Sequence, residues 1–334
     1  MADLKTNYLS LDLKNPLVAS ASPLSKKVSL VKRLEDNGIS AVVLYSLFEE
    51  QITHELRELN FFLERGTEQY PEALTYFPDL GNYNIGPDAY MEHIRTLKEC
   101  VDIPVIASLN GISSGKWIRY AAMIEQAGAD ALELNIYFLP TDPKMTGQSL
   151  EKAYIKLVAD IRQTIHIPIA LKLTPFFTSL PNMVAKAVSA GANGFVLFNR
   201  FMQPDLDIEA LEVETTVNLS TSNDLLLPMR WIAMLYGRIR ADLALSSGVH
   251  TARDVVKAIM AGANVAMMAS TLLLNGIEQA SAILADLDVW MNANDYASVI
   301  EMRGCLSQEK SANPAAYERA QYMKALRAFD QHLL

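Results

Sequence analysis

Cysteine and histidine are scarce in this chain. Only two cysteines, Cys100 and Cys305, and five histidines occur among 334 residues. Two cysteines alone build neither a disulfide framework nor a zinc cluster. The histidines are scattered, with no two at the spacing of metal ligands. We therefore expect no metal site, and two ordinary thiols in a reducing cytoplasm.

Long apolar runs and an excess of basic residues are also absent. The first residues contain no apolar core of signal-peptide length, and the longest apolar stretches, such as 265–274, are too short or too polar to cross a bilayer. The 29 Lys and Arg residues are outnumbered by 38 Asp and Glu residues, for a net charge of −9. We expect a cytoplasmic protein that binds neither membranes nor nucleic acid.

A repeated pattern fills the rest of the chain, of which 50% is hydrophobic. Four segments combine the end of a helix-like stretch, a glycine and a short, nearly continuous apolar run: 36–46, 126–136, 189–199 and 260–270. The glycine suits the left-handed position that ends a helix. A run without polar alternation is typical of a parallel strand buried on both faces.

Four further strands are predicted at 15–22, 102–110, 166–175 and 241–248, which makes eight with helix-period segments between them. Eight alternating units predict a (β/α)₈ TIM barrel, in place of two domains. An open doubly wound sheet is the alternative, but its glycine-rich first turn is missing from 19–27. The expected helices are 25–37, 87–100, 114–127, 149–164, 179–190, 251–261 and 272–292.

We treat residues 1–334 as a single TIM-barrel domain. The barrel itself is expected over about 15–292, with a C-terminal helical tail at 293–334. Two insertions, 47–86 after the second strand and 201–228 after the sixth, follow the carboxyl ends of strands. Long loops at that end of a barrel are usually functional. The tail could cover the bottom of the barrel or mediate dimerisation.

Polar residues at the carboxyl ends of the strands are the candidates for chemistry. Lys172 lies within an apolar strand, where a lysine is costly unless it is paired or used. It could form a Schiff base, clamp a phosphate, donate to an electron-rich ring, or pair with Glu133. Asn135 and Asn199 end two other strands, and each could meet a heterocycle or cap a loop.

The ends of the last two strands carry a different signal. Small-residue turns at Ser247-Gly248 and Ala269-Ser270 each precede a helix. Neighbouring helix N-termini with exposed backbone N–H groups bind phosphate, and barrels often place such a site there. These turns predict a phosphorylated ligand.

The order of the segments NPLVASA, ELN, ALKLTP, FVLFN, SSGV and GANVAMMAS resembles the dihydroorotate dehydrogenase family of FMN flavoproteins over roughly residues 5–290. The resemblance implies FMN as cofactor, oxidation of dihydroorotate or a related small molecule, and a role in pyrimidine biosynthesis. A homodimer and an electron-transfer partner are further implications. The residues implied to hold FMN are Ser20, Ala21, Ser22, Asn135, Lys172, Ser247, Gly248, Ala269 and Ser270; those implied for substrate are Asn84, Asn135 and Asn199.

The segment after Asn135 departs from the family pattern. The family places a Cys or Ser base there, whereas this chain has Phe138 or Leu139 at that position, depending on the alignment of Pro140. Neither side chain accepts a proton. Tyr137 and Thr141 are the weak candidates for a catalytic hydroxyl. The alternative function is therefore a barrel with an altered substrate or no catalysis, such as a subunit of a redox assembly.

Overall fold

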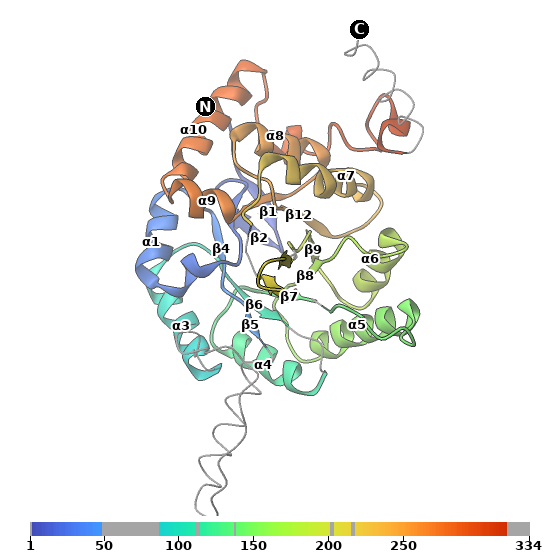
Figure 1. The fold of residues 1–334 in the computed structure, drawn as a ribbon. Helices are drawn as coiled ribbons and strands as arrows, with labels where there is room; N and C mark the ends of the chain where they lie inside the picture. The colour runs from blue at the N-terminus through green and yellow to red at the C-terminus, as the bar shows by residue number, and fades with distance from the viewer. Residues whose placement is uncertain are drawn as a thin grey trace, which may run out of the picture.

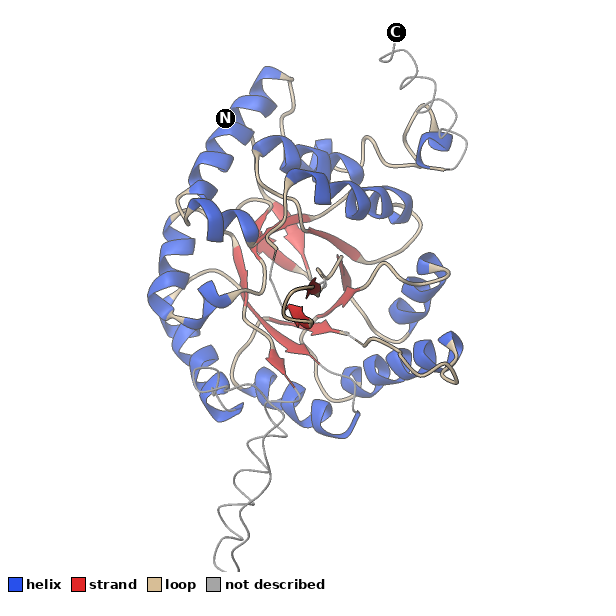
Figure 2. Ribbon diagram, viewed as in Figure 1, coloured by secondary structure: helices blue, strands red, loops and turns tan. Residues whose placement is uncertain are grey.

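The fold is a closed parallel barrel surrounded by helices (Figures 1 and 2). The computed structural model describes residues 2–48, 87–110, 114–136, 138–200, 204–214 and 218–318. The barrel strands are β3 (Leu17–Ala19), β4 (Ala41–Val43), β6 (Val105–Asn110), β7 (Ala131–Asn135), β8 (Ile169–Leu173), β9 (Gly194–Leu197), β12 (Asp242–Ser246) and β13 (Val265–Met268).

Closure of the sheet comes from the pairing of β4 with β6. The hydrogen-bonded order is β4-β3-β13-β12-β9-β8-β7-β6, and β4 also pairs with β6, which joins the two ends. Every barrel pair is parallel. The short strand β5 (Leu47–Phe48) pairs with the end of β6. The predicted eight-stranded barrel is thus confirmed.

The helices lie outside the strands, and their apolar sides pack on the barrel. The expected 272–292 helix is instead two helices, because Gly276 between them has φ +88 and interrupts the helix. The glycines that end four helices before β4, β7, β9 and β13 also have positive φ, as their pattern predicted. The main helices are α1 (Val28–Asp36), α3 (Pro87–Cys100), α4 (Ser114–Gln126), α5 (Gly147–Arg162), α6 (Leu180–Ser189), α7 (Leu226–Leu235), α8 (Ala252–Ala261), α9 (Ser270–Asn275) and α10 (Gln279–Ala293).

Alternate strand residues separate two cores. In β3, Leu17 and Ala19 point outward to the helices, whereas Val18 points into the barrel, because successive side chains of a strand face opposite ways. A hairpin of β1 (Thr6–Tyr8) and β2 (Leu11–Leu13) adds Tyr8 to the inner core. The hairpin bonds to the starts of β12 and β13, so it closes the bottom of the barrel and leaves the other end for a site.

The first insertion continues beyond β5 into residues 49–86, which lie outside the described residues. The second contains a hairpin of β10 (Asp205–Asp207) and β11 (Glu212–Glu214), followed by the 3₁₀ helix η2 (Ser222–Leu225). Both insertions leave the carboxyl ends of their strands, as expected.

The C-terminal segment contains α11 (Val299–Met302) and η3 (Pro314–Tyr317), and the rest of the predicted helical tail, 319–334, is not described. Backbone bonds join this segment to Ile259 and Met260 at the end of α8 and to Ala233 in α7. The described part therefore packs at the lower rim of the barrel. Within the described ranges, no helix combines the length and the apolarity that crossing a membrane requires.

Candidate active site

A cavity of about 630 Å³ opens where the barrel strands end. We call it the mouth cavity. Residues that follow β3, β9, β12 and β13 line it, together with Lys172 of β8. Eight of the nine residues expected to hold FMN line this cavity, although they come from four parts of the chain: Ser20, Ala21, Ser22, Lys172, Ser247, Gly248, Ala269 and Ser270.

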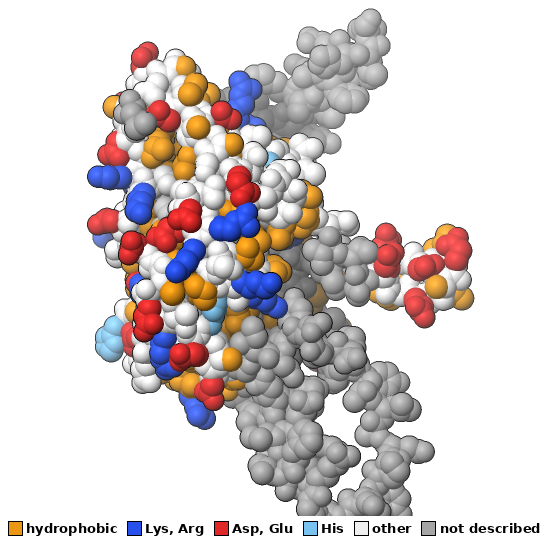
Figure 3. Space-filling view, turned by 90° about the vertical axis from the view of Figure 1, so that its left-hand side faces the viewer, with side chains coloured by type: hydrophobic (Ala, Val, Ile, Leu, Met, Phe, Trp, Pro, Cys, Tyr) orange, Lys and Arg blue, Asp and Glu red, His pale blue; other side chains and the backbone are white. Residues whose placement is uncertain are grey.

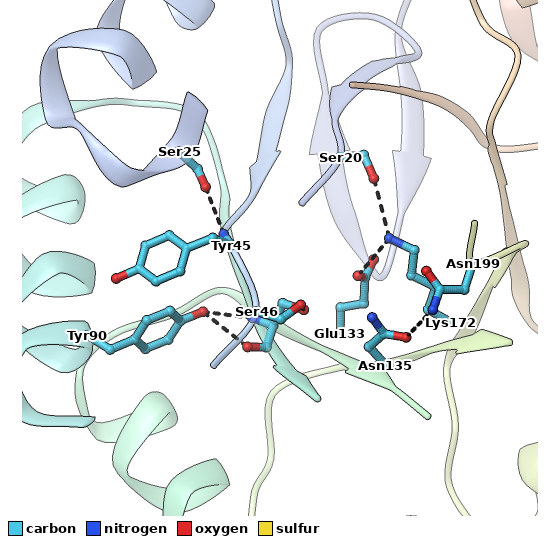
Figure 4. A network of polar contacts seen from close by, with 10 residues as sticks. Ser20, Ser25, Tyr45, Ser46, Tyr90, Glu133, Asn135, Lys172 and Asn199 are labelled. Carbon is cyan, nitrogen blue, oxygen red and sulfur yellow. Dashed lines mark hydrogen bonds and ion pairs between the residues drawn. The ribbon is translucent and has the colours of Figure 1, made fainter. Parts of the chain in front are cut away.

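Lys172 is the buried cation of the site. Its side chain is 7% exposed, and Nζ lies 3.4 Å from Oε1 of Glu133, whose side chain is 1% exposed. Nζ also lies 3.5 Å from Oγ of Ser20 (Figure 4). Both contacts are at the long limit for hydrogen bonds. Pairing with Glu133 and a place at the cavity were considered as alternatives from the sequence, and the structure combines them.

Glu133 lies deeper in the barrel than the cavity lining, and its second oxygen, Oε2, has no hydrogen-bond partner among the described residues. The hydroxyl of Tyr8, from the bottom hairpin, is likewise unpartnered there. Burial, and then the carboxylates of Glu133 and Asp242, raise the pKa of Tyr8 well above its ordinary value. Tyr8 therefore stays neutral, and Lys172 is the charge partner that compensates Glu133.

The two predicted asparagines meet on one wall of the barrel, at the ends of β7 and β9, which are the two neighbours of β8. Nδ2 of Asn199 donates to Oδ1 of Asn135 at 3.0 Å (Figure 4). Asn199 lines the mouth cavity, whereas Asn135 is 7% exposed and supports it. The bond orients the amide of Asn199, because its nitrogen must face Asn135.

The two predicted turns lie side by side, and a third segment joins them. The backbone N–H of Ser220 donates to Oγ of Ser270 at 3.0 Å, and that of Gly248 donates to Oγ of Ser220 at 3.4 Å. Ser247 and Gly248 both have positive φ, +81 and +78. A Cβ on Gly248 would stand 2.2 Å from the backbone nitrogen of Leu225, so only glycine fits.

The sequence predicted free backbone N–H groups at the start of α8, and two of these groups are not free. Oδ2 of Asp254 accepts from the backbone N–H groups of His250 and Thr251 at 3.1 and 3.0 Å. These two amides are therefore bonded within the chain. The groups that face the cavity belong instead to the turn Ser246–Val249 and to Ala269 and Ser270.

Arg200 and Asp224 line the cavity and were not singled out from the sequence. Nη1 of Arg200 lies 3.3 Å from Oδ2 of Asp224, and both side chains are partly exposed. Burial raises the pKa of Asp224, but the N–H of Thr221 and the charge of Arg200 outweigh it and lower that pKa below 3.8. The position of Arg200 directly after Asn199 was the available sequence signal.

Other candidates lie elsewhere or cannot be placed. Asn84 and Tyr137 are outside the described residues, and Thr141 is exposed and does not line the cavity. Cys100 ends α3 and Cys305 follows α11, so neither thiol lines the cavity. In the described part of the chain, no three His, Cys, Asp or Glu residues form a group able to hold a metal ion.

Tyr45, at the end of the second barrel strand, turns away from the group around Lys172 (Figure 4). Its ring packs edge-on against Tyr90, with 5.1 Å between centroids. Burial raises the pKa of Tyr45 to about 12. This tyrosine is therefore part of the packing between the strand and α3, and it does not serve as a base in the cavity.

Comparison with known proteins agrees with this geometry. The family model described as dihydroorotate dehydrogenase matches residues 3–291. A dihydroorotate dehydrogenase B (NAD(+)) catalytic subunit from Methanothermobacter thermautotrophicus is 25% identical over 309 residues, 90% of this chain and 97% of the relative. The one from Thermoplasma acidophilum is 26% identical over 91% and 99%. A dihydroorotate dehydrogenase A (fumarate) from Lactobacillus delbrueckii is 24% identical over 81% and 88%. The chain belongs to the dihydroorotate dehydrogenase family.

Proposed function

We propose that the protein is an FMN-dependent oxidoreductase of the dihydroorotate dehydrogenase type, with FMN bound in the mouth cavity. The observation that supports this most is the convergence on one cavity of eight residues that the family resemblance implies for FMN. Its volume of about 630 Å³ is within the range of cofactor sites. FMN, when bound, would accept the hydride that the substrate loses.

The residues present fit both ends of this cofactor. Ser247, Gly248, Ala269 and Ser270 would hold the phosphate, because small side chains leave their backbone accessible to an anion. Lys172 would face the electron-rich part of the ring. Its ammonium is buried and has two long contacts to the described residues, so a further acceptor would satisfy it. Its positive charge would stabilise the negative charge of the reduced ring.

The remaining polar groups of the cavity favour a small substrate with carboxylate and amide groups. Asn199 offers an oriented amide, and Arg200 offers a planar guanidinium that matches a carboxylate. Dihydroorotate has both groups, and the relatives are named for it. We therefore propose dihydroorotate or a close analogue as substrate, with a place in pyrimidine biosynthesis.

The proton acceptor is the part of the site that favours the alternative of an altered substrate. The family base position falls on Phe138, which packs on the core, or on Leu139, which is 57% exposed. Carbon side chains accept no proton. These residues would be consistent with a substrate that gives up a hydride and needs no base in this loop to remove a proton from carbon.

An absorbance spectrum of the purified protein tests cofactor binding. We expect flavin bands in the wild type and in the control variant Lys156→Met, which replaces an exposed lysine on α5. In Lys172→Met we expect the FMN affinity to be at least about tenfold lower. Colourless protein that FMN does not reconstitute would refute the proposal.

Anaerobic mixing of the flavoprotein with dihydroorotate then separates the two substrate assignments. Bleaching of the flavin supports dihydroorotate, because the hydride has then passed to the ring. No bleaching over minutes supports the altered substrate.

A further inference from the structure

The phosphate end of the mouth cavity has no basic side chain in its described lining. Three short segments line it: 218–220, 246–249 and 269–270. None of them contains Lys, Arg or His. The basic residues elsewhere in the lining, Lys172 and Arg200, are each paired with a carboxylate. The hairpin of β10 and β11, which projects on the mouth side of the barrel, adds acidic side chains (Figure 3). A phosphate group would therefore gain from a positive charge close to the two turns.

Ser220 connects the two turns and faces the cavity. Its backbone N–H donates to Oγ of Ser270 at 3.0 Å, and the residue is only 4% exposed while lining the cavity. Its Oγ accepts from the N–H of Gly248 at 3.4 Å, which is near the long limit for a hydrogen bond. A hydroxyl has one proton to donate and two lone pairs, so Ser220 keeps its proton for a further acceptor.

His250 is the further partner of this hydroxyl. Its Nε2 lies 3.1 Å from Oγ of Ser220. His250 is partly buried and does not line the cavity, so it lies behind Ser220 as seen from a bound anion. A neutral ring with its proton on Nδ1 accepts the hydroxyl proton of Ser220 at Nε2. A protonated ring donates from both nitrogens, which leaves the hydroxyl proton free to point into the cavity.

Asp254 fixes the position of both partners. Its Oδ2 accepts from the backbone N–H of His250 at 3.1 Å and from Oγ of Ser222 at 2.8 Å. Ser222 follows Ser220 by two residues, and Asp254 is 2% exposed. One buried carboxylate therefore holds the histidine and the serine segment against each other.

The other charged groups on the elements packed against this pair keep their charge near neutral pH. Carboxyl, ammonium and guanidinium groups ordinarily do so between about pH 5.5 and 8, whereas histidine changes its charge in that range. The helix α9 contains no charged residue. The groups are Asp254, Lys257 and Arg253 of α8, Asp224 of η2, and Arg200, which pairs with Asp224.

We propose that His250, acting through Ser220, is the cationic component of the phosphate site, so that binding of a phosphate monoester or a similar tetrahedral dianion takes up a proton from solvent at His250. The proposal rests on the assignment of the two turns to phosphate in the proposed function. Protonation puts a positive charge behind the backbone donors and frees the Ser220 hydroxyl to donate, and hydrogen bonds to charged groups are the stronger ones. His250 is a positioning residue, because it acts on the anion through Ser220.

Sulfate is the probe, on the full chain stripped of flavin. Sulfate stays doubly charged between about pH 5.5 and 8, whereas the phosphate of FMN itself titrates near pH 6. Calorimetry at constant ionic strength measures the sulfate affinity at both pH values. Repeating it in two buffers of different ionisation enthalpy counts the protons taken up on binding.

We expect the wild type to bind sulfate at least about fivefold more tightly at about pH 5.5 than at about pH 8, with proton uptake. His250→Gln places an uncharged N–H near the position of Nε2, so it should bind equally at both pH values and take up no proton. Ser220→Ala should bind at least about threefold more weakly at the lower pH. The control is His166→Gln, because His166 precedes β8 at the other end of the barrel and its side chain is 96% exposed; it should behave as the wild type.

Three results would overturn the proposal. They are a wild-type affinity that does not change with pH, a pH dependence that His250→Gln retains, and the absence of sulfate binding at about pH 5.5. Sulfate binding that neither His250→Gln nor Ser220→Ala alters would lie at another place and would count against it in the same way.

Fluorescence titration with FMN and with riboflavin, which lacks the phosphate, keeps this proposal separate from the proposed function. If neither flavin binds while sulfate binding stays linked to His250, the cofactor assignment fails and the role of His250 stands. If FMN binds and the sulfate affinity is independent of pH, the cofactor assignment stands and the role of His250 fails.

Discussion

The buried pair of Lys172 and Glu133 gives the sharpest test of how the site is held together. The two charged atoms lie 3.4 Å apart, and the side chains are 7% and 1% exposed. Two unit charges at this distance attract by about 5 kcal/mol at an effective dielectric constant of 20. Removing one partner of a buried pair leaves the other charge uncompensated, which costs about 3–5 kcal/mol.

We therefore expect Glu133→Gln and Lys172→Met each to lower the free energy of unfolding by about 4 kcal/mol. An unfolding entropy of about 2.1 cal/mol/K per residue over this chain corresponds to roughly 1.4 °C per kcal/mol. Each single variant should thus melt about 6 °C below the wild type. The double variant removes both charges. Its melting temperature should therefore fall by much less than the sum of the two single decreases.

Thermal unfolding followed by circular dichroism measures these shifts, on samples stripped of any bound flavin so that ligand binding does not contribute. Asp160→Asn, which removes an exposed ion pair with Lys156 on α5, is the control and should change the melting temperature by less than about 1 °C. If the two single losses add in the double variant, the side chains are not energetically coupled, and the reasoning about Lys172 is wrong.

Three further predictions concern the mouth cavity. Gly248→Ala should weaken FMN binding at least about tenfold in a fluorescence titration, because its Cβ would stand 2.2 Å from the nitrogen of Leu225 at a φ of +78; unchanged affinity would contradict the assigned turn. Asp224→Asn should lower the melting temperature at pH 7. Folding lowers the pKa of Asp224. The stability that its charge contributes is therefore complete above the ordinary pKa of 3.8 and disappears as the pH falls through the lowered pKa. A difference in melting temperature from the wild type that persists at about pH 2 would contradict this assignment. Arg200→Gln should raise KM for a carboxylate substrate about tenfold or more, and an unchanged KM would place the carboxylate elsewhere.

The barrel was predictable from the sequence because its signals are local. Glycines at helix ends, continuous apolar runs and helix-period segments each act over about ten residues. The prediction was wrong over 272–292, where Gly276 divides one expected helix into two. The apolar sequence on both sides of that glycine suits a helix throughout. The positive φ of Gly276 turns the backbone and separates α9 from α10.

The position of the candidate site at the strand ends could be predicted from the sequence. The hydrogen bonds and ion pairs between its residues could not. Lys172 and the turns at Ser247-Gly248 and Ala269-Ser270 stood out because charged or small residues interrupt apolar strands. That Ser220 bridges the two turns, and that Arg200 pairs with Asp224, depends on loops whose sequences carry no periodic signal. Such contacts between distant segments form only when the strands are brought into register.

The sequence by itself determined the eight-stranded barrel, the end at which the cavity opens, and nine of the 25 residues that line the cavity, since each follows from patterns within single segments. Tertiary structure alone decided that Lys172 both lines the cavity and compensates Glu133, and that Asn135 orients Asn199. These are relations between side chains up to 64 positions apart in the chain. Closure of the barrel creates them, because it places the ends of all eight strands around one opening.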